Sequence, residues 1–112
     1  MSEKLVVFVS CAGREQAEKI AGAVVEERLA ACVNVLEGVR SCYMWEGKVT
    51  WAEEVLLVVK TTAAAFGGLE RRVLELHSYD VPEIVGVRIE VGEAKYLKWM
   101  GESVGSSMTN DN

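Results

Sequence analysis

The sequence contains one histidine and one proline, and both fall within a single short stretch, residues 77–84. It lacks any run of Lys or Arg that could follow a nucleic-acid backbone, and 12 basic against 17 acidic side chains give a formal net charge of −5. Its three cysteines include no Cys-x-x-Cys pair, which argues against a disulfide framework and a structural zinc site. We therefore expect reduced thiols and no nucleic-acid partner.

Long apolar runs are also missing. The apolar run at residues 5–9 is too short for a signal-peptide core or a membrane span. The sequence contains no phosphate-binding glycine loop, no His-Glu-x-x-His pair and no serine elbow, and a single histidine without a nucleophile beside it forms no catalytic triad. These absences favour a cytoplasmic protein that is not an enzyme and has no membrane partner.

The apolar pattern changes several times between the period of a strand and that of a helix, within a length of 112 residues that suits one domain. The predicted strands are 5–9, 31–45, 48–60 and 85–92, and the predicted helices are 14–29, 66–76 and 93–100. This order favours an α+β fold of the ferredoxin-like (βαββαβ) type, an antiparallel sheet with two helices on one face, followed by a C-terminal helix. We assign residues 1–104 to this domain and residues 105–112 to a disordered tail.

The second and third predicted strands form a hairpin that is much longer than the first strand. Its far end carries aromatic side chains that a lone hairpin cannot bury, and the last helix carries two more. We expect a neighbouring subunit to cover them; the alternative is that the hairpin folds back over its own sheet. The candidate interface residues are Tyr43, Trp45, Trp51, Tyr96 and Trp99.

The stretch at residues 77–84 connects the second helix to the fourth strand, and Pro82 prevents the helix from continuing. In the ferredoxin-like arrangement this connection lies at the edge where the first strand ends, so Cys11, His77 and Glu83 are predicted neighbours. A thiolate, an imidazole and a carboxylate together suit copper. The alternative is structural: a buried small cysteine, a histidine that caps a helix, and a glutamate paired with Lys60 or an arginine.

Blocks of residues spread over nearly the whole chain form a recognisable series. They are 29–34 (Leu-Ala-Ala-Cys-Val-Asn), 41–48 (Ser-Cys-Tyr-Met-Trp-Glu-Gly-Lys), 56–61 (Leu-Leu-Val-Val-Lys-Thr), 77–84 (His-Ser-Tyr-Asp-Val-Pro-Glu-Ile) and 96–99 (Tyr-Leu-Lys-Trp). In this order and spacing they resemble the CutA divalent-cation tolerance proteins. Ser78 departs from the family pattern, which commonly has proline at that position.

The resemblance implies a ferredoxin-like subunit in a tight homotrimer, similar in architecture to the PII signalling proteins. It also implies copper binding and tolerance to divalent metal ions as the associated activity, with metal ions and further copies of the chain as partners. The alternative is a PII-like trimer that senses a small ligand or acts as a scaffold without metal. A cluster of basic residues would favour nucleotides, but the candidates are scattered: Arg40, Lys48, Lys60 and Arg88.

Overall fold

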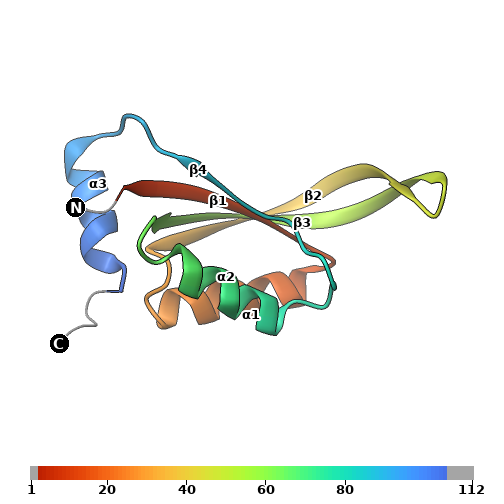
Figure 1. The fold of residues 1–112 in the computed structure, drawn as a ribbon, viewed down its shortest axis with the longest axis horizontal. Coiled ribbons are helices and arrows are strands. Elements are labelled where there is room, and N and C mark those ends of the chain that lie inside the picture. The colour runs from red at the N-terminus through yellow and green to blue at the C-terminus, as the bar shows by residue number, and fades with distance from the viewer. Residues whose placement is uncertain (1–2, 106–112) are drawn as a thin grey trace.

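In the computed structural model the described part of the chain, residues 3–105, forms a four-stranded antiparallel sheet and three helices. The elements are β1 (Lys4–Cys11), α1 (Arg14–Glu26), β2 (Cys32–Trp45), β3 (Lys48–Thr62), α2 (Phe66–Leu76), β4 (Ile84–Arg88) and α3 (Ala94–Ser103). Helices α1 and α2 lie side by side on one face of the sheet, and α3 stands at one end (Figure 1). The strand order β2-β3-β1-β4 is the ferredoxin-like order, which confirms the predicted fold class.

Most of the predicted tail, residues 106–112, lies outside the described residues. Within residues 3–105, none of the helices has the length and apolar character needed to cross a membrane.

The core lies between the sheet and the two helices that cover it. Alternate residues of β1, namely Val7, Val9 and Cys11, are fully buried on the helix side, and their cross-strand partners on β3 are buried as well. Successive strand residues point to opposite faces, so this alternation follows from the extended backbone. The helices complete the core with Ala17, Ile20 and Val24 from α1 and Leu69 and Val73 from α2.

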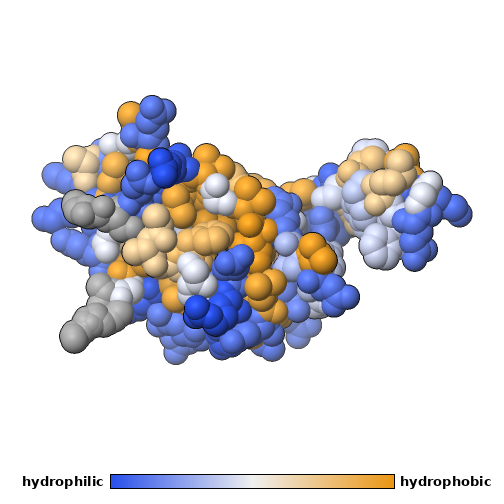
Figure 2. All heavy atoms as spheres, viewed as in Figure 1, coloured by the Kyte–Doolittle hydropathy of each residue, from blue (hydrophilic) through white to orange (hydrophobic). Residues whose placement is uncertain are grey.

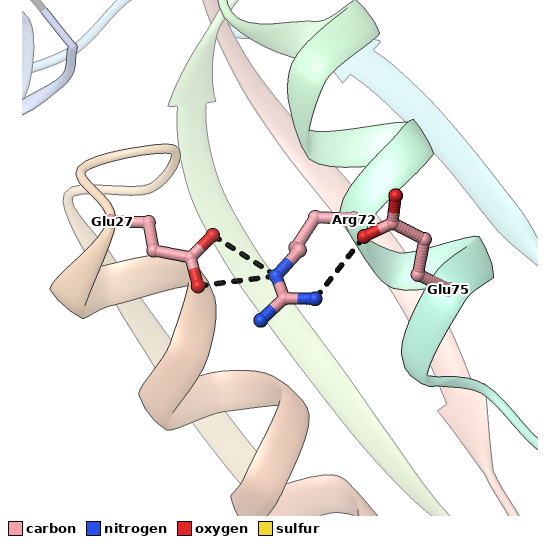
Figure 3. Close-up of polar contacts among 3 residues, drawn as sticks. All are labelled: Glu27, Arg72 and Glu75. Atoms are coloured by element: carbon pink, nitrogen blue, oxygen red, sulfur yellow. Dashed lines mark hydrogen bonds and ion pairs between the residues drawn. The ribbon is translucent and has the colours of Figure 1, made fainter.

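Arg72 of α2 joins the two covering helices (Figure 3). Its Nε donates to both carboxylate oxygens of Glu27, at 3.0 and 3.1 Å, and its Nη1 donates to Glu75 at 3.1 Å. These hydrogen bonds raise the pKa of Arg72 above its ordinary value. All three side chains are at least one-third exposed, so the contact orients the helices more than it stabilises them.

The end of α1 differs from the prediction, which continued the helix to Leu29. The helix ends at Glu26 because Arg28 has a left-handed backbone (φ 61°), and the amides of Leu29 and Ala30 then both donate to the carbonyl of Val24. Leu29 still packs against the core, which is why it fell in phase with the helical pattern. A non-glycine residue at positive φ leaves no clear signal in a sequence.

The fourth strand is also shorter than predicted. β4 ends at Arg88 rather than residue 92, and Val91 is 84% exposed although the alternation of apolar residues continues to it. The last helix begins at Ala94, where the Glu93 side chain accepts a hydrogen bond from the amide of Tyr96 at 2.8 Å. It runs to Ser103, three residues beyond the predicted end at residue 100.

The long hairpin extends away from the body, as Figures 1 and 2 show. β2 and β3 have 14 and 15 residues against 8 in β1, and the described chain measures 48 × 28 × 21 Å. Glu46 (φ 50°) and Gly47 (φ 79°) form its tip with two left-handed residues, the turn that matches the twist of paired strands. The hairpin therefore does not fold back over its own sheet, and that alternative is wrong for this chain.

Candidate functional site

His77 occupies the position directly after α2 and is buried, with 9% of its surface exposed. Its ring Nε2 lies 2.7 Å from the carbonyl oxygen of Ser10, and its Nδ1 accepts the backbone N–H of Tyr79 at 3.1 Å. Because a carbonyl can only accept, Nε2 carries the proton and Nδ1 uses its lone pair on Tyr79. Both ring nitrogens are therefore occupied by hydrogen bonds.

Glu83 meets the same residue of β1 from another direction. The hydroxyl of Ser10 donates to Glu83 Oε1 at 2.8 Å, so Ser10 binds Glu83 through its side chain and His77 through its backbone. The structure thus brings His77 and Glu83 to the end of β1, next to Cys11, as the topology predicted. The structural alternative paired Glu83 with Lys60 or an arginine; here Ser10 donates to Glu83, and Lys60 donates to Asn34 Oδ1.

Cys11 is adjacent in sequence, but its side chain belongs to the core. It is fully buried in line with Val7 and Val9, whereas the neighbouring Ser10 side chain points to the other face of β1 and holds Glu83 there. Burial, and secondarily the negative charge of Glu54, raise the pKa of Cys11 to about 11. The thiol therefore keeps its proton at neutral pH, whereas metal binding requires the thiolate.

The predicted copper ligands do not fit a metal ion in this arrangement. Among residues 3–105, no three His, Cys, Asp or Glu side chains are placed to hold one together. Joint coordination by Cys11, His77 and Glu83 would require His77 to give up a hydrogen bond and Cys11 to lose its proton and leave the core. The three-residue site stays a prediction that depends on such a rearrangement.

The sequence analysis missed two residues of the polar cluster at this corner, Ser10 and Tyr79. Tyr79 donates its hydroxyl to Glu54 Oε2 of β3 at 2.7 Å, and its ring centroid lies 4.8 Å from that of His77. Partial burial, followed by the hydrogen bond and charge of Glu54, raises the pKa of Tyr79 to about 12. The available signals were a tyrosine inside the corner stretch and a serine that interrupts the apolar pattern of the first strand. The cluster ties β1, β3 and the connection after α2 together.

The aromatic residues predicted to lie in an interface form two exposed surfaces. We call the first the arm patch; it consists of Tyr43, Met44, Trp45, Val49 and Trp51, which are 44–66% exposed. The second is the α3 patch, where Tyr96 and Trp99 have ring centroids 5.6 Å apart and are 41% and 44% exposed. In the described chain these surfaces remain largely open to solvent.

Comparison with known proteins agrees with the sequence blocks. A family model described as "CutA1 divalent ion tolerance protein" matches residues 5–103. The divalent-cation tolerance protein CutA of Thermus thermophilus is 50% identical over 100 residues, which cover 89% of this chain and 97% of that protein. The chloroplastic protein CutA 1 of rice is 41% identical over 103 residues, which cover 92% of this chain but only 58% of the relative.

A solved structure extends this agreement to the fold. The crystal structure of CutA1 from Oryza sativa superimposes with a TM-score of 0.92 at 40% identity, covering 95% of this chain and 97% of that one. The chain therefore belongs to the CutA1 divalent ion tolerance protein family.

Proposed function

We propose that this protein acts in tolerance to divalent cations as a homotrimer, with divalent metal ions as partners. The observation that supports assembly is the arm patch, in which Met44, Trp45 and Trp51 are 66%, 61% and 57% exposed. Large apolar side chains exposed on both faces of a projecting arm mark an interaction site. The number of copies, three, comes from the resemblance to the family.

A second apolar surface supports the same assembly. The sheet face opposite α1 and α2 carries Val6 and Phe8 of β1 and their partners on β4, Val85 and Val87, which are each 51% exposed. β2 and β4 are also the edges of the sheet, and edge strands are prone to pair with other chains. A closed ring of subunits would cover this face and both edges together.

Sedimentation equilibrium tests the assembly. We expect wild-type protein to be trimeric at micromolar concentration and Trp45→Ala to weaken the trimer by roughly 3 kcal/mol per chain, because a large aromatic contact is lost. Leu74→Ala is the matched control, since Leu74 is a 48% exposed apolar residue on α2, away from the arm. A monomeric wild type, or equal weakening by both substitutions, would contradict the proposal.

Copper binding is tested by isothermal titration of wild type, Cys11→Ser and His77→Ala, each confirmed to be trimeric. His77 uses both ring nitrogens and Cys11 holds its proton, so we expect each substitution to change copper affinity by less than about twofold. A loss of about tenfold or more in either variant would show that the corner opens to metal. That result would restore Cys11, His77 and Glu83 as the site.

A PII-like sensor of small phosphorylated ligands ranks second. Three of the four basic candidates are engaged at separate places. Arg40 lies 4.7 Å above the ring of Trp51, and Arg88 pairs with Glu3 at 2.8 Å. Lys60 binds Asn34. A shared fold alone is weak support for a shared ligand. The family description names a tolerance protein and no reaction, which agrees with the expectation that the protein is not an enzyme.

The cytoplasm remains the expected compartment. Family membership does not fix it, because the rice relative is described as chloroplastic. Fractionation of the source cells, followed by detection of the native protein with an antibody, would decide the matter.

A further inference from the structure

One face of the arm carries two sulfur atoms, at a distance along the chain from the corner at His77. Cys42 is an exposed free cysteine, and Met44, two residues further along β2, is 66% exposed. Their cross-strand partners on β3 are Trp51 and Val49. Because residues two apart along a strand share a face, both sulfurs lie on the same side of the arm, which stands clear of the body in Figure 2.

The spacing of these residues suits a single metal ion held by both sulfurs. Cα atoms two residues apart on a strand are separated by about 6.8 Å. Metal–sulfur bonds of about 2.3 Å bring two sulfurs on one ion to within about 4.6 Å of each other. The unbranched side chain of Met44 has several rotatable bonds and covers the difference without a change in the backbone. β2 is paired with β3 from Val39 to Trp45, so the ladder fixes the positions from which both side chains start.

The two donors favour the reduced copper ion. A thiolate and a thioether are soft ligands, which select Cu(I), whereas Mg²⁺ and Ca²⁺ take oxygen ligands and structural zinc sites need more donors than this pair supplies. The guanidinium of Arg40, 4.7 Å over the ring of Trp51, is no obstacle, because Cu(I) bound to a thiolate forms a neutral pair. The face therefore matches Cu(I) in both donor type and charge.

We propose that Cys42 and Met44 bind one Cu(I) ion on each copy of the arm. Cys42 releases its thiol proton to solvent, the thiolate and the Met44 sulfur each donate a lone pair to the ion, and no electron is transferred. The proposal rests on the copper binding included in the proposed function and places it away from Cys11, His77 and Glu83. One copy supplies both ligands, so the site does not depend on the number of copies in the assembly.

Anaerobic competition with bicinchoninate, a chelator that colours when it binds Cu(I), tests the proposal on the native full-length assembly at neutral pH. We expect wild type to withdraw one Cu(I) per chain from the chelator. Cys42→Ser and Met44→Leu nearly conserve side-chain size and should each weaken Cu(I) binding about tenfold or more, because losing a ligand costs at least as much as losing a residue that supports one. Cys32→Ser is the matched control, since it removes a half-buried thiol elsewhere on β2, and should leave the affinity unchanged.

Met44→Leu is the decisive variant, because an exposed thiol binds Cu(I) through its thiolate even without a thioether beside it. Undiminished affinity in Met44→Leu, equal losses in Cys42→Ser and Cys32→Ser, or no Cu(I) bound by wild type would each overturn the proposal. The ε-methyl NMR signal of Met44 should shift with Cu(I), whereas that of the fully buried Met100 should not. The assay counts Cu(I) per chain, so its failure is distinct from failure of the trimer in sedimentation.

Discussion

Alkaline pH should destabilise this protein through a single buried thiol. Cys11 is fully buried in the core, and its pKa is raised from 9.0 to about 11, first by burial and then by the charge of Glu54. In the unfolded chain the thiol ionises near its ordinary value, while in the folded chain it keeps its proton over the next two pH units. Between pH 9 and 11 the unfolded state therefore binds fewer protons than the folded state, and stability falls as pH rises.

The magnitude follows from the shift. One pKa unit corresponds to about 1.4 kcal/mol, so the shift from 9.0 to about 11 gives a contribution of roughly 3 kcal/mol per chain. This contribution is fully present below pH 9 and is lost once the pH has passed 11. It is an upper value, because partial unfolding or water entry near the strand end would lower it.

Guanidinium unfolding at pH 8 and pH 11, at one fixed protein concentration, measures the effect. Wild type should lose about 2–3 kcal/mol more than Cys11→Ala over this interval, because lysines and tyrosines titrate in both proteins and cancel in the difference. Cys42→Ala, which removes an exposed thiol, is the matched control and should follow wild type. The same pH dependence in wild type and Cys11→Ala would refute the reasoning.

Two further substitutions test the core and the attachment of α3. Leu57→Ala, at a fully buried position of β3, should cost about 2–5 kcal/mol in guanidinium unfolding, and a loss below about 1 kcal/mol would show that the site is not tightly packed. Arg28→Ala removes the hydrogen bonds to the end of α3 and should cost about 1 kcal/mol. Hydrogen exchange should then quicken in α3 but not in β1; equal quickening in both would contradict the local role of Arg28.

Strong periodicity made the fold predictable, and its limits explain the errors. β1, α1 and α2 appeared at the expected places because their buried faces repeat with the period of a strand or a helix. The end of α1 depended on the backbone of Arg28, and the end of β4 depended on whether Val91 found a partner. Neither depends on the hydrophobic pattern, so the pattern could not place them.

The corner at His77 shows a different limit. His77 and Glu83 lie at the end of β1 as predicted, because the order of the helices and strands sets the topology. Side-chain direction is set by the alternation along one strand, which turns Cys11 inward and Ser10 outward. Adjacent residues of a strand could have been assigned to opposite faces from the sequence alone, which would have weakened the three-ligand hypothesis. The partners of the imidazole could not have been predicted, because Ser10 lies 67 residues away in the sequence.

The distribution of apolar residues on the arm favours a ring over a simple pair of subunits. Met44 pairs with Val49, and Trp51 lies on the same face, whereas Tyr43 and Trp45 point to the opposite face. Contact with one flat surface would therefore leave half of the arm patch in water. An arm that lies between two neighbours is covered on both faces, and a closed ring of more than two subunits provides that arrangement for every copy. If Trp45→Ala and Trp51→Ala weaken assembly equally, although they lie on opposite faces, the arm is enclosed in this way; an effect of only one would indicate a one-sided contact.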